Sequence, residues 1–175
     1  MQLAFPFTGP ALPDAYGINQ PADQLIDGLN LTSFPFTVTD LPTGTKTVAF
    51  DVIDHDTIPI VGYSWLHWLG ANIPVTGPTV TIPEDASRQE FCVQGTNSIG
   101  NILAQIKRPI GFDYDLTQHY TGPRPRGGEH IYRLEVYALE TMLPLTAGYY
   151  FSDFMRASEG HVLATAHANL TYTRK

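Results

Sequence analysis

The chain has little of what secreted and membrane proteins depend on. It contains a single cysteine, Cys92, so no disulfide can form within the chain, and the alternation around it in "QEFCVQG" predicts a buried free thiol, not a nucleophile. No run of about 18 apolar residues occurs, so no membrane-spanning helix is expected. The first basic residue is Lys46, and Pro6, Pro10 and Pro13 interrupt the start, which argues against a signal peptide. These features predict a cytoplasmic protein.

Positive charge is also scarce. The sequence has 10 Lys and Arg against 17 Asp and Glu, which gives a formal net charge of -7. Nucleic acids and anionic membranes are bound chiefly through Lys and Arg, so the composition argues against both as partners. Half of the basic residues lie between Lys107 and Arg133, and this is the part of the chain where an anion is best tolerated.

Patterns typical of β-strands occur along most of the sequence. With 175 residues, 43% of them apolar, the chain is expected to form one domain, 1–175, with a full hydrophobic core. Alternation over 46–53 and 130–139 predicts half-buried strands, and Pro/Gly clusters separate further short extended runs. One helix is predicted over 152–166, followed by a strand over 167–173. The expected fold is an all-β sandwich of antiparallel sheets, with one or two short helices near the C-terminus.

Two histidines on predicted strands are the first candidates for chemistry. In "YSWLHWLGANIP" (63–74), strict alternation predicts that His67 shares one strand face with Trp65, Leu69 and Ala71. On the later strand, His130 shares its face with Tyr132. If the two strands are neighbours, two imidazoles, a phenol and an indole converge.

Carboxylates and glycines flank these strands. The stretch "DVIDHDTIP" carries Asp51, Asp54 and Asp56, and "TGPRPRGG" comes just before His130. Glycines let backbone N–H groups approach a ligand and hold an anion. A carboxylate that orients an imidazole, which then donates to a bound anion, is one consistent use of these parts.

Five motifs, in order, resemble one family. They are "DHDTIP", "WLHWLGANIP", "VQGTNSIG", "YTGPRPRGGEHIYRLEVYAL" and "GHVLATAHANLTYTR". The chain resembles the phosphatidylethanolamine-binding proteins, in particular the bacterial and archaeal Raf-kinase-inhibitor-like branch of the YbhB/YbcL type, over almost its whole length. The resemblance implies a β-sandwich with a small surface pocket for phosphate-like or carboxylate anions, including a phospholipid headgroup. The ligand-binding residues that it implies are Asp54, Asp56, His67, Gly122, Pro123, His130 and Tyr132.

The chain departs from the family pattern at several points. The family's Asp-Pro-Asp-Ala-Pro is here one residue longer, Asp54-His55-Asp56-Thr57-Ile58-Pro59, with His55 in place of proline. Ser98 stands where Asp is usual, and Ile131 where Arg is usual. The segment 101–119 is longer than the usual connection. Its apolar residues predict a homodimer; they are Ile102, Leu103, Ile106, Ile110 and Phe112.

Three function classes stay open. The first is a module that binds a small anion or headgroup and modulates an unknown partner protein, as an inhibitor of a kinase or protease would; the kinase comes from the resemblance alone. The second is a metal-dependent enzyme, although no spacing such as H-x-H or H-E-x-x-H occurs. The third is a hydrolase built on the His67, His130 and Asp54 cluster, although no G-x-S-x-G motif occurs. We expect the first, with no catalytic residue, metal or cofactor.

Overall fold

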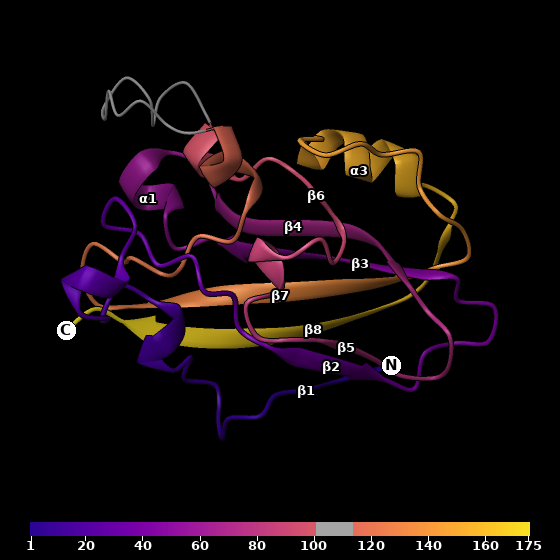
Figure 1. The fold of residues 1–175 in the computed structure, drawn as a ribbon, viewed down its shortest axis with the longest axis horizontal. Coiled ribbons are helices and arrows are strands. Elements are labelled where there is room, and N and C mark those ends of the chain that lie inside the picture. The colour runs from indigo at the N-terminus through magenta and orange to yellow at the C-terminus, as the bar shows by residue number, and fades with distance from the viewer. Residues whose placement is uncertain (101–113) are drawn as a thin grey trace.

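A computed structural model describes residues 1–100 and 114–175 of the chain. Its strands form two antiparallel sheets, one of three strands in the order β1-β2-β5 and one of five in the order β6-β4-β3-β7-β8 (Figure 1). This confirms the expected all-β antiparallel architecture. The strands are β1 (Gln2–Ala4), β2 (Phe36–Thr39), β3 (Thr47–Asp54), β4 (Trp65–Pro74), β5 (Val80–Ile82), β6 (Val93–Gln94), β7 (Glu129–Leu139) and β8 (Val162–Thr173). The α-helices are α1 (Ile58–Val61) and α3 (Phe151–Ser158), and 3-10 turns occur at Asp14–Tyr16, Ala22–Gln24, Ala86–Arg88, Ser98–Gly100 and Tyr114–Gln118.

The main core lies between the two sheets. The inward faces of β2 and β3 bring Phe36 and Phe50 into contact, with ring centroids 5.4 Å apart and the rings nearly perpendicular. Edge-to-face packing of this kind stabilises aromatic pairs beyond the area that they bury. The inward faces predicted for 46–53 and 130–139 are confirmed, because their residues belong to this core or to the buried cavity wall. The prediction of a half-buried strand is right for 130–139 but wrong for 46–53, since the other face of β3 is buried under a second apolar layer. The core members are Val48, Phe50, Val52, Tyr132, Leu134, Val136 and Ala138.

A second apolar layer covers the outer face of the five-stranded sheet. Phe154 of α3 packs there on Ala49 and Leu69. The helix predicted over 152–166 is too long, since α3 ends at Ser158 and β8 already begins at Val162. Gly160, at φ 78°, provides a left-handed turn between them, and β8 then pairs along the whole of β7.

Cys92 packs against the main core just before β6. It is a free thiol, as predicted, but it is partly buried where full burial was expected. Burial raises the pKa of the thiol to about 12 because it disfavours the charged thiolate. The side chain therefore stays a neutral thiol at neutral pH.

A β-bulge in β4 decides where His67 points. The pairs on either side of the bulge are Val52 with Trp68 and Ile53 with Leu66. His67 is thus the extra residue of β4, and it lies on the same side as Trp65. Leu69 and Ala71 belong instead to the layer beneath α3, so the predicted face of four side chains is wrong for these two. Strict alternation fails here because a bulge adds one residue to a single strand.

The end of β3 and the starts of β4 and β7 meet at one end of the larger sheet. In this antiparallel arrangement Asp54 pairs with Trp65 on one side and with Tyr132 on the other. The helix α1 and the C-terminus lie at this same end, away from α3 (Figure 1). None of the described helices is long and apolar enough to cross a membrane.

Candidate functional site

A cavity of about 440 Å³ opens at this end of the sheet. Volumes of this size accommodate organic ligands and exceed what a bare anion fills. The cavity wall includes five of the seven predicted binding residues, namely Asp54, His67, Gly122, His130 and Tyr132. Asp56 and Pro123 are not among its lining residues.

Asp54 and His130 form a buried pair at the floor of the cavity. His130 Nδ1–H donates to Asp54 Oδ2 over 2.7 Å, with only 5% and 1% of the two residues exposed. The other carboxylate oxygen accepts the backbone N–H of Asp56 at 2.8 Å. The imidazole is therefore held in one orientation, and Nε2 is its remaining nitrogen.

His67 is fixed in a similar way from the other side. Its Nδ1–H donates to the carbonyl oxygen of Thr121 over 2.6 Å, and the N–H of Thr121 donates back to the carbonyl of His67 at 3.0 Å. Because a carbonyl can only accept, Nδ1 bears the proton and Nε2 of the neutral ring is an acceptor. Burial lowers the pKa of His67, and nearby His130 adds to this, while the bond to Thr121 and the Asp54 carboxylate act in the opposite direction.

Tyr132 lies close to both imidazoles. Its ring centroid is 5.1 Å from that of His67 and 6.4 Å from that of His130. The hydroxyl is buried and has no hydrogen-bond partner among the described residues. Burial, and then the nearby Asp54 carboxylate, raise the pKa of Tyr132, so the phenol stays a neutral donor. An unpaired buried hydroxyl is costly, and a ligand oxygen in the cavity would satisfy it.

Asp56 anchors the loop that carries α1. Its Oδ2 accepts the backbone N–H of Ile131 at 2.8 Å and so ties this loop to β7. The hydroxyl of Thr57 donates to the carbonyls of Asp54 and Tyr63, each at 2.9 Å. Asp56 thus fixes the loop next to the cavity wall, although the loop is one residue longer than the family pattern.

Gly122 is required by close packing. A Cβ on Gly122 would lie 2.5 Å from the carbonyl oxygen of Tyr16, so no larger residue fits. Its N–H donates to the carbonyl of Asn30 at 2.8 Å, and the carbonyl of Pro123 accepts the N–H of Ile18 at 3.0 Å. The turn therefore shapes the wall, while its backbone groups are bonded within the protein.

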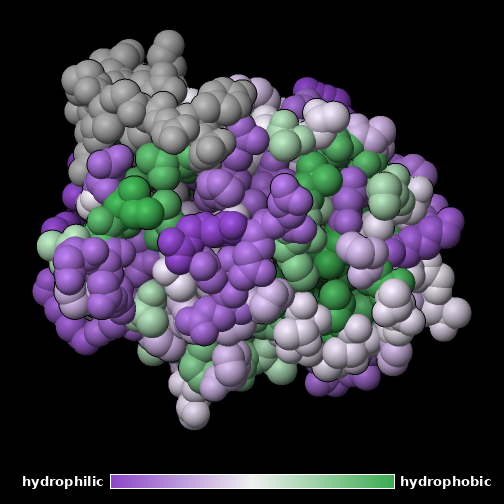
Figure 2. All heavy atoms as spheres, in the orientation of Figure 1, coloured by the Kyte–Doolittle hydropathy of each residue, from purple (hydrophilic) through white to green (hydrophobic). Residues whose placement is uncertain are grey.

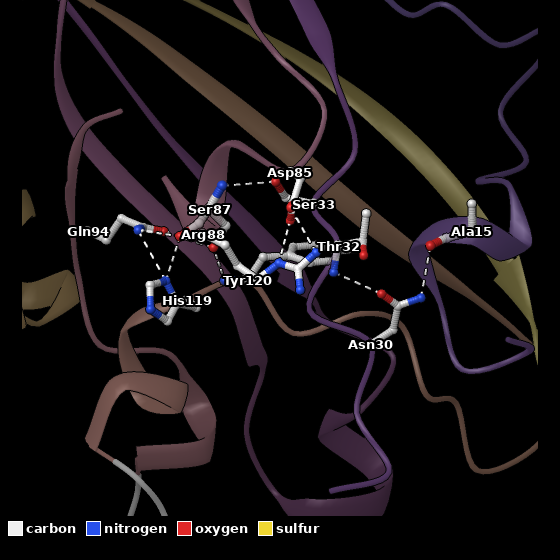
Figure 3. Close-up of polar contacts among 10 residues, drawn as sticks. All are labelled: Ala15, Asn30, Thr32, Ser33, Asp85, Ser87, Arg88, Gln94, His119 and Tyr120. Atoms are coloured by element: carbon white, nitrogen blue, oxygen red, sulfur yellow. Dashed lines mark hydrogen bonds and ion pairs between the residues drawn. The ribbon is translucent and has the colours of Figure 1, made fainter. Parts of the chain in front are cut away.

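A buried polar network holds this segment in place (Figure 3). Tyr120 N–H donates to Ser87 Oγ over 2.6 Å, and Ser87 Oγ donates in turn to Gln94 Oε1 over 3.0 Å. On the other side, the amide of Asn30 donates to the carbonyl of Ala15 at 2.9 Å, as the same figure shows. Thr121 and Gly122 are thus presented to the cavity by a segment that is fixed on both flanks.

The mouth of the cavity holds residues that sequence reasoning missed. Three arginines line it, Arg124, Arg126 and Arg174, together with the stacked rings of Tyr63 and Trp65, whose centroids are 6.1 Å apart. The cluster of basic residues between Lys107 and Arg133 was a signal for the first two. No comparable signal indicated Arg174, because it reaches the cavity mouth only through the pairing of β8 with β7. The remaining apolar wall comprises Leu29, Ile60, Val61, Ile99 and Pro125.

Two further expectations concern metal binding and assembly. Among the described residues, no group of three or more His, Cys, Asp or Glu side chains is placed to hold a metal ion. The apolar residues for which a homodimer was predicted all lie within 101–113, outside the described residues. The homodimer stays a prediction.

Comparisons with known proteins agree with this fold. The model of a family described as "Phosphatidylethanolamine-binding protein" matches residues 6–173. The uncharacterized protein YxkA of Bacillus subtilis is 37% identical over 163 residues, covering 92% of this chain and 93% of that protein. The crystal structure of the putative phosphatidylethanolamine-binding protein homolog CT736 of Chlamydia trachomatis aligns with a TM-score of 0.74 at 26% identity, over 99% of this chain and 97% of that one. The crystal structure of Escherichia coli YbcL aligns with a TM-score of 0.73 at 25% identity, over 99% and 98%.

Proposed function

Because the chain belongs to the phosphatidylethanolamine-binding protein family, we propose that its cavity binds a small phosphate-like or carboxylate anion, free or as part of a phospholipid headgroup. One observation carries the proposal. His67, His130 and Tyr132 are all buried in the cavity wall, and each keeps one polar atom that no described residue satisfies. An anion between them would accept from the phenol and from imidazoles that carry a proton on Nε2.

The protonation of the two imidazole rings determines how an anion can bind. Both imidazoles use Nδ1–H as a donor, so in its neutral form each presents an acceptor to the ligand. An anion is bound well only when a ring takes up a proton, or when the ligand brings a proton of its own, as hydrogen phosphate does. Anion binding is therefore coupled to the protonation of a ring or of the ligand, with Asp54 holding His130 through its Nδ1–H.

We propose binding without catalysis. The two threonine hydroxyls in the wall are already donors to carbonyl groups, Thr57 to Asp54 and Tyr63, and Thr121 to His67. Neither hydroxyl is positioned by an imidazole as a nucleophile would be. The described residues also offer no metal-holding group that could activate water. Hydrolysis on the His67, His130 and Asp54 cluster is the alternative.

The family resemblance extends the proposal to a role in the cell. A protein that binds a ligand without converting it can act only through what it binds. We therefore propose that the liganded chain binds and modulates a partner protein, as a kinase or protease inhibitor would. The unpaired thiol of Cys92 suits a reducing compartment, and supports a cytoplasmic location.

Titration calorimetry with inorganic phosphate and with phosphoethanolamine tests the site. His67→Ala and His130→Ala should each weaken binding by roughly 10- to 100-fold through a lost charge-assisted hydrogen bond. His161→Ala, on an exposed histidine at the α3 end, is the matched control and should have no effect. Equal affinity in all four proteins would place the ligand elsewhere. Ester hydrolysis by the wild type that disappears in His67→Ala would favour the enzyme.

A further inference from the structure

The cavity is a positive region in an acidic protein. Its described lining contains three arginines and one aspartate, with no lysine or glutamate, whereas the whole chain carries -7. The one acid, Asp54, is buried at the floor and already bonded to His130. Two of these arginines, Arg126 and Arg174, thus place positive charge at the mouth, where an entering ligand would meet it.

Of the five Lys and Arg side chains described elsewhere, four have an acidic partner, and the fifth, Lys46, is exposed without a described one. The pairs are Arg88 with Asp85, Arg133 with Glu135, Arg156 with Asp153 and Lys175 with Asp14. At the mouth, Arg126 and Arg174 are exposed and form no ion pair with any described residue. The contrast is sharpest at the end of the chain, where Lys175 is paired and Arg174 beside it is not.

The cavity is larger than a single anion, so a ligand that fills it has an additional part between the floor and the mouth. A phosphate ion is only a few times the roughly 30 Å³ of a water molecule, so it fills a small part of 440 Å³. The intervening wall is apolar and aromatic, with Tyr63, Trp65 and Ile60 among its members. Hydrophobic residues also gather on the surface at the α1 end of the molecule, where Ile58 and Ile60 are 48% and 44% exposed (Figure 2).

From these observations we infer that the site selects a ligand with two anionic groups: a phosphate-like head at the two imidazoles, a short apolar body, and a second acid at Arg126 and Arg174. The inference rests on the proposed function, since it assumes that the head binds at His67 and His130. A zwitterionic headgroup is disfavoured, because its ammonium would face arginines. The ligand class is therefore a phosphorylated or phosphonylated carboxylic acid.

Three matched sets of synthetic ligands test this. They share a phosphonate head and an alkyl chain of two to six carbons, and they end in a methyl, an ammonium or a carboxylate group. At one chain length the carboxylate should bind about tenfold more tightly than the methyl compound, and the ammonium more weakly than either. The advantage of the carboxylate should shrink as salt is raised, because the arginines are exposed.

Variants locate the second acid. Arg126→Gln and Arg174→Gln should remove the advantage of the carboxylate while leaving the affinity for the methyl compound nearly unchanged. Arg156→Gln makes the same change of charge on α3, at the other end of the molecule, and should leave all three affinities unaltered.

The outcomes separate this inference from the proposal beneath it. Methyl and carboxylate compounds that bind equally, in a manner that depends on His67, would overturn the two-anion inference and leave anion binding intact. If no phosphonate binds at all, the proposed function itself fails. An advantage of the carboxylate that persists in Arg126→Gln, Arg174→Gln and the double variant would also overturn the assignment to these arginines.

Discussion

Two buried carboxylates on β3 have opposite surroundings. Asp54 and Asp51 are three residues apart, so they project from opposite faces of the sheet, and they are 1% and 3% exposed. Asp54 receives an imidazole N–H and a backbone N–H at the floor of the cavity. Asp51 lies beneath the α3 layer and receives one phenol, Tyr137 Oη–H, at 2.9 Å.

The difference shows that burial alone does not make a site. Burial raises the pKa of Asp51 to about 7; the bond from Tyr137 opposes this, while Glu135 adds to it. Asp51 thus resembles a perturbed catalytic acid, but it does not line the cavity, and the nearby unpaired hydroxyl of Tyr149 is likewise buried beneath α3. Asp54 instead orients a ring that lines a cavity. The convergence of polar groups on a cavity distinguishes the functional end of β3, and a shifted pKa does not.

The largest expected effect is on stability, through Asp51. Its folded pKa of about 7 lies above the ordinary value near 4, so the folded state binds the extra proton and stability is lost as pH rises through this window. Between pH 5 and 8 this amounts to about 2–3 kcal/mol. Asp51→Asn cannot ionise, so the free energy of unfolding from urea titrations should lose that part of its pH dependence. An unchanged pH profile would mean that Asp51 is solvated.

Phosphate binding should depend on the other buried carboxylate, Asp54. Asp54→Asn keeps the shape but removes the carboxylate that accepts from His130 Nδ1–H and orients the ring, so phosphate affinity should fall by roughly 30-fold, or about 2 kcal/mol. Asp51→Asn is the matched control on the same strand, and calorimetry should show wild-type affinity. Equal losses in both variants would point to a general distortion of β3.

Much of this arrangement could be predicted from local pattern. Alternation located β3 and β7, because both strands have one face in the main core, and the ordered motifs indicated the family and the imidazole pair. The convergence of His130 with Asp54 then depends only on β3 and β7 being neighbours. Local sequence sufficed where each residue's environment follows from its own strand.

The features that sequence reasoning missed depend on long-range register. The bulge that turns His67 toward the cavity exists only in the pairing of β4 with β3, so periodicity within β4 assigned Leu69 and Ala71 to the wrong face. Arg174 reaches the mouth through pairing of β8 with β7. Gly160 ended the helix earlier than its apolar pattern suggested, because the strand that follows gains a full partner.

Affinity for anions should rise as pH falls. The pKa of free His67 is lowered by burial, and a bound anion favours the protonated ring, so binding takes up a proton. Sulfate is the suitable probe, since it does not itself titrate here. We expect up to about a tenfold gain in affinity per pH unit from pH 7.5 downward, levelling off once free His67 is protonated. His67→Gln should flatten the profile measured by calorimetry, and an unchanged slope would assign the proton to another group.

The smallest effect compares two buried phenols. The hydroxyls of Tyr132 and Tyr149 both lack a partner among the described residues, but only Tyr132 lines the cavity. Tyr132→Phe should lower sulfate affinity about three- to fivefold, the loss of one neutral donor worth roughly 1 kcal/mol. Tyr149→Phe, beneath α3, should leave affinity unchanged. Both variants should match or exceed wild-type stability in urea titrations without ligand, since each removes a buried hydroxyl that bonds to nothing described. A loss of binding in Tyr149→Phe, or none in Tyr132→Phe, would erase the distinction between the two faces of the sheet.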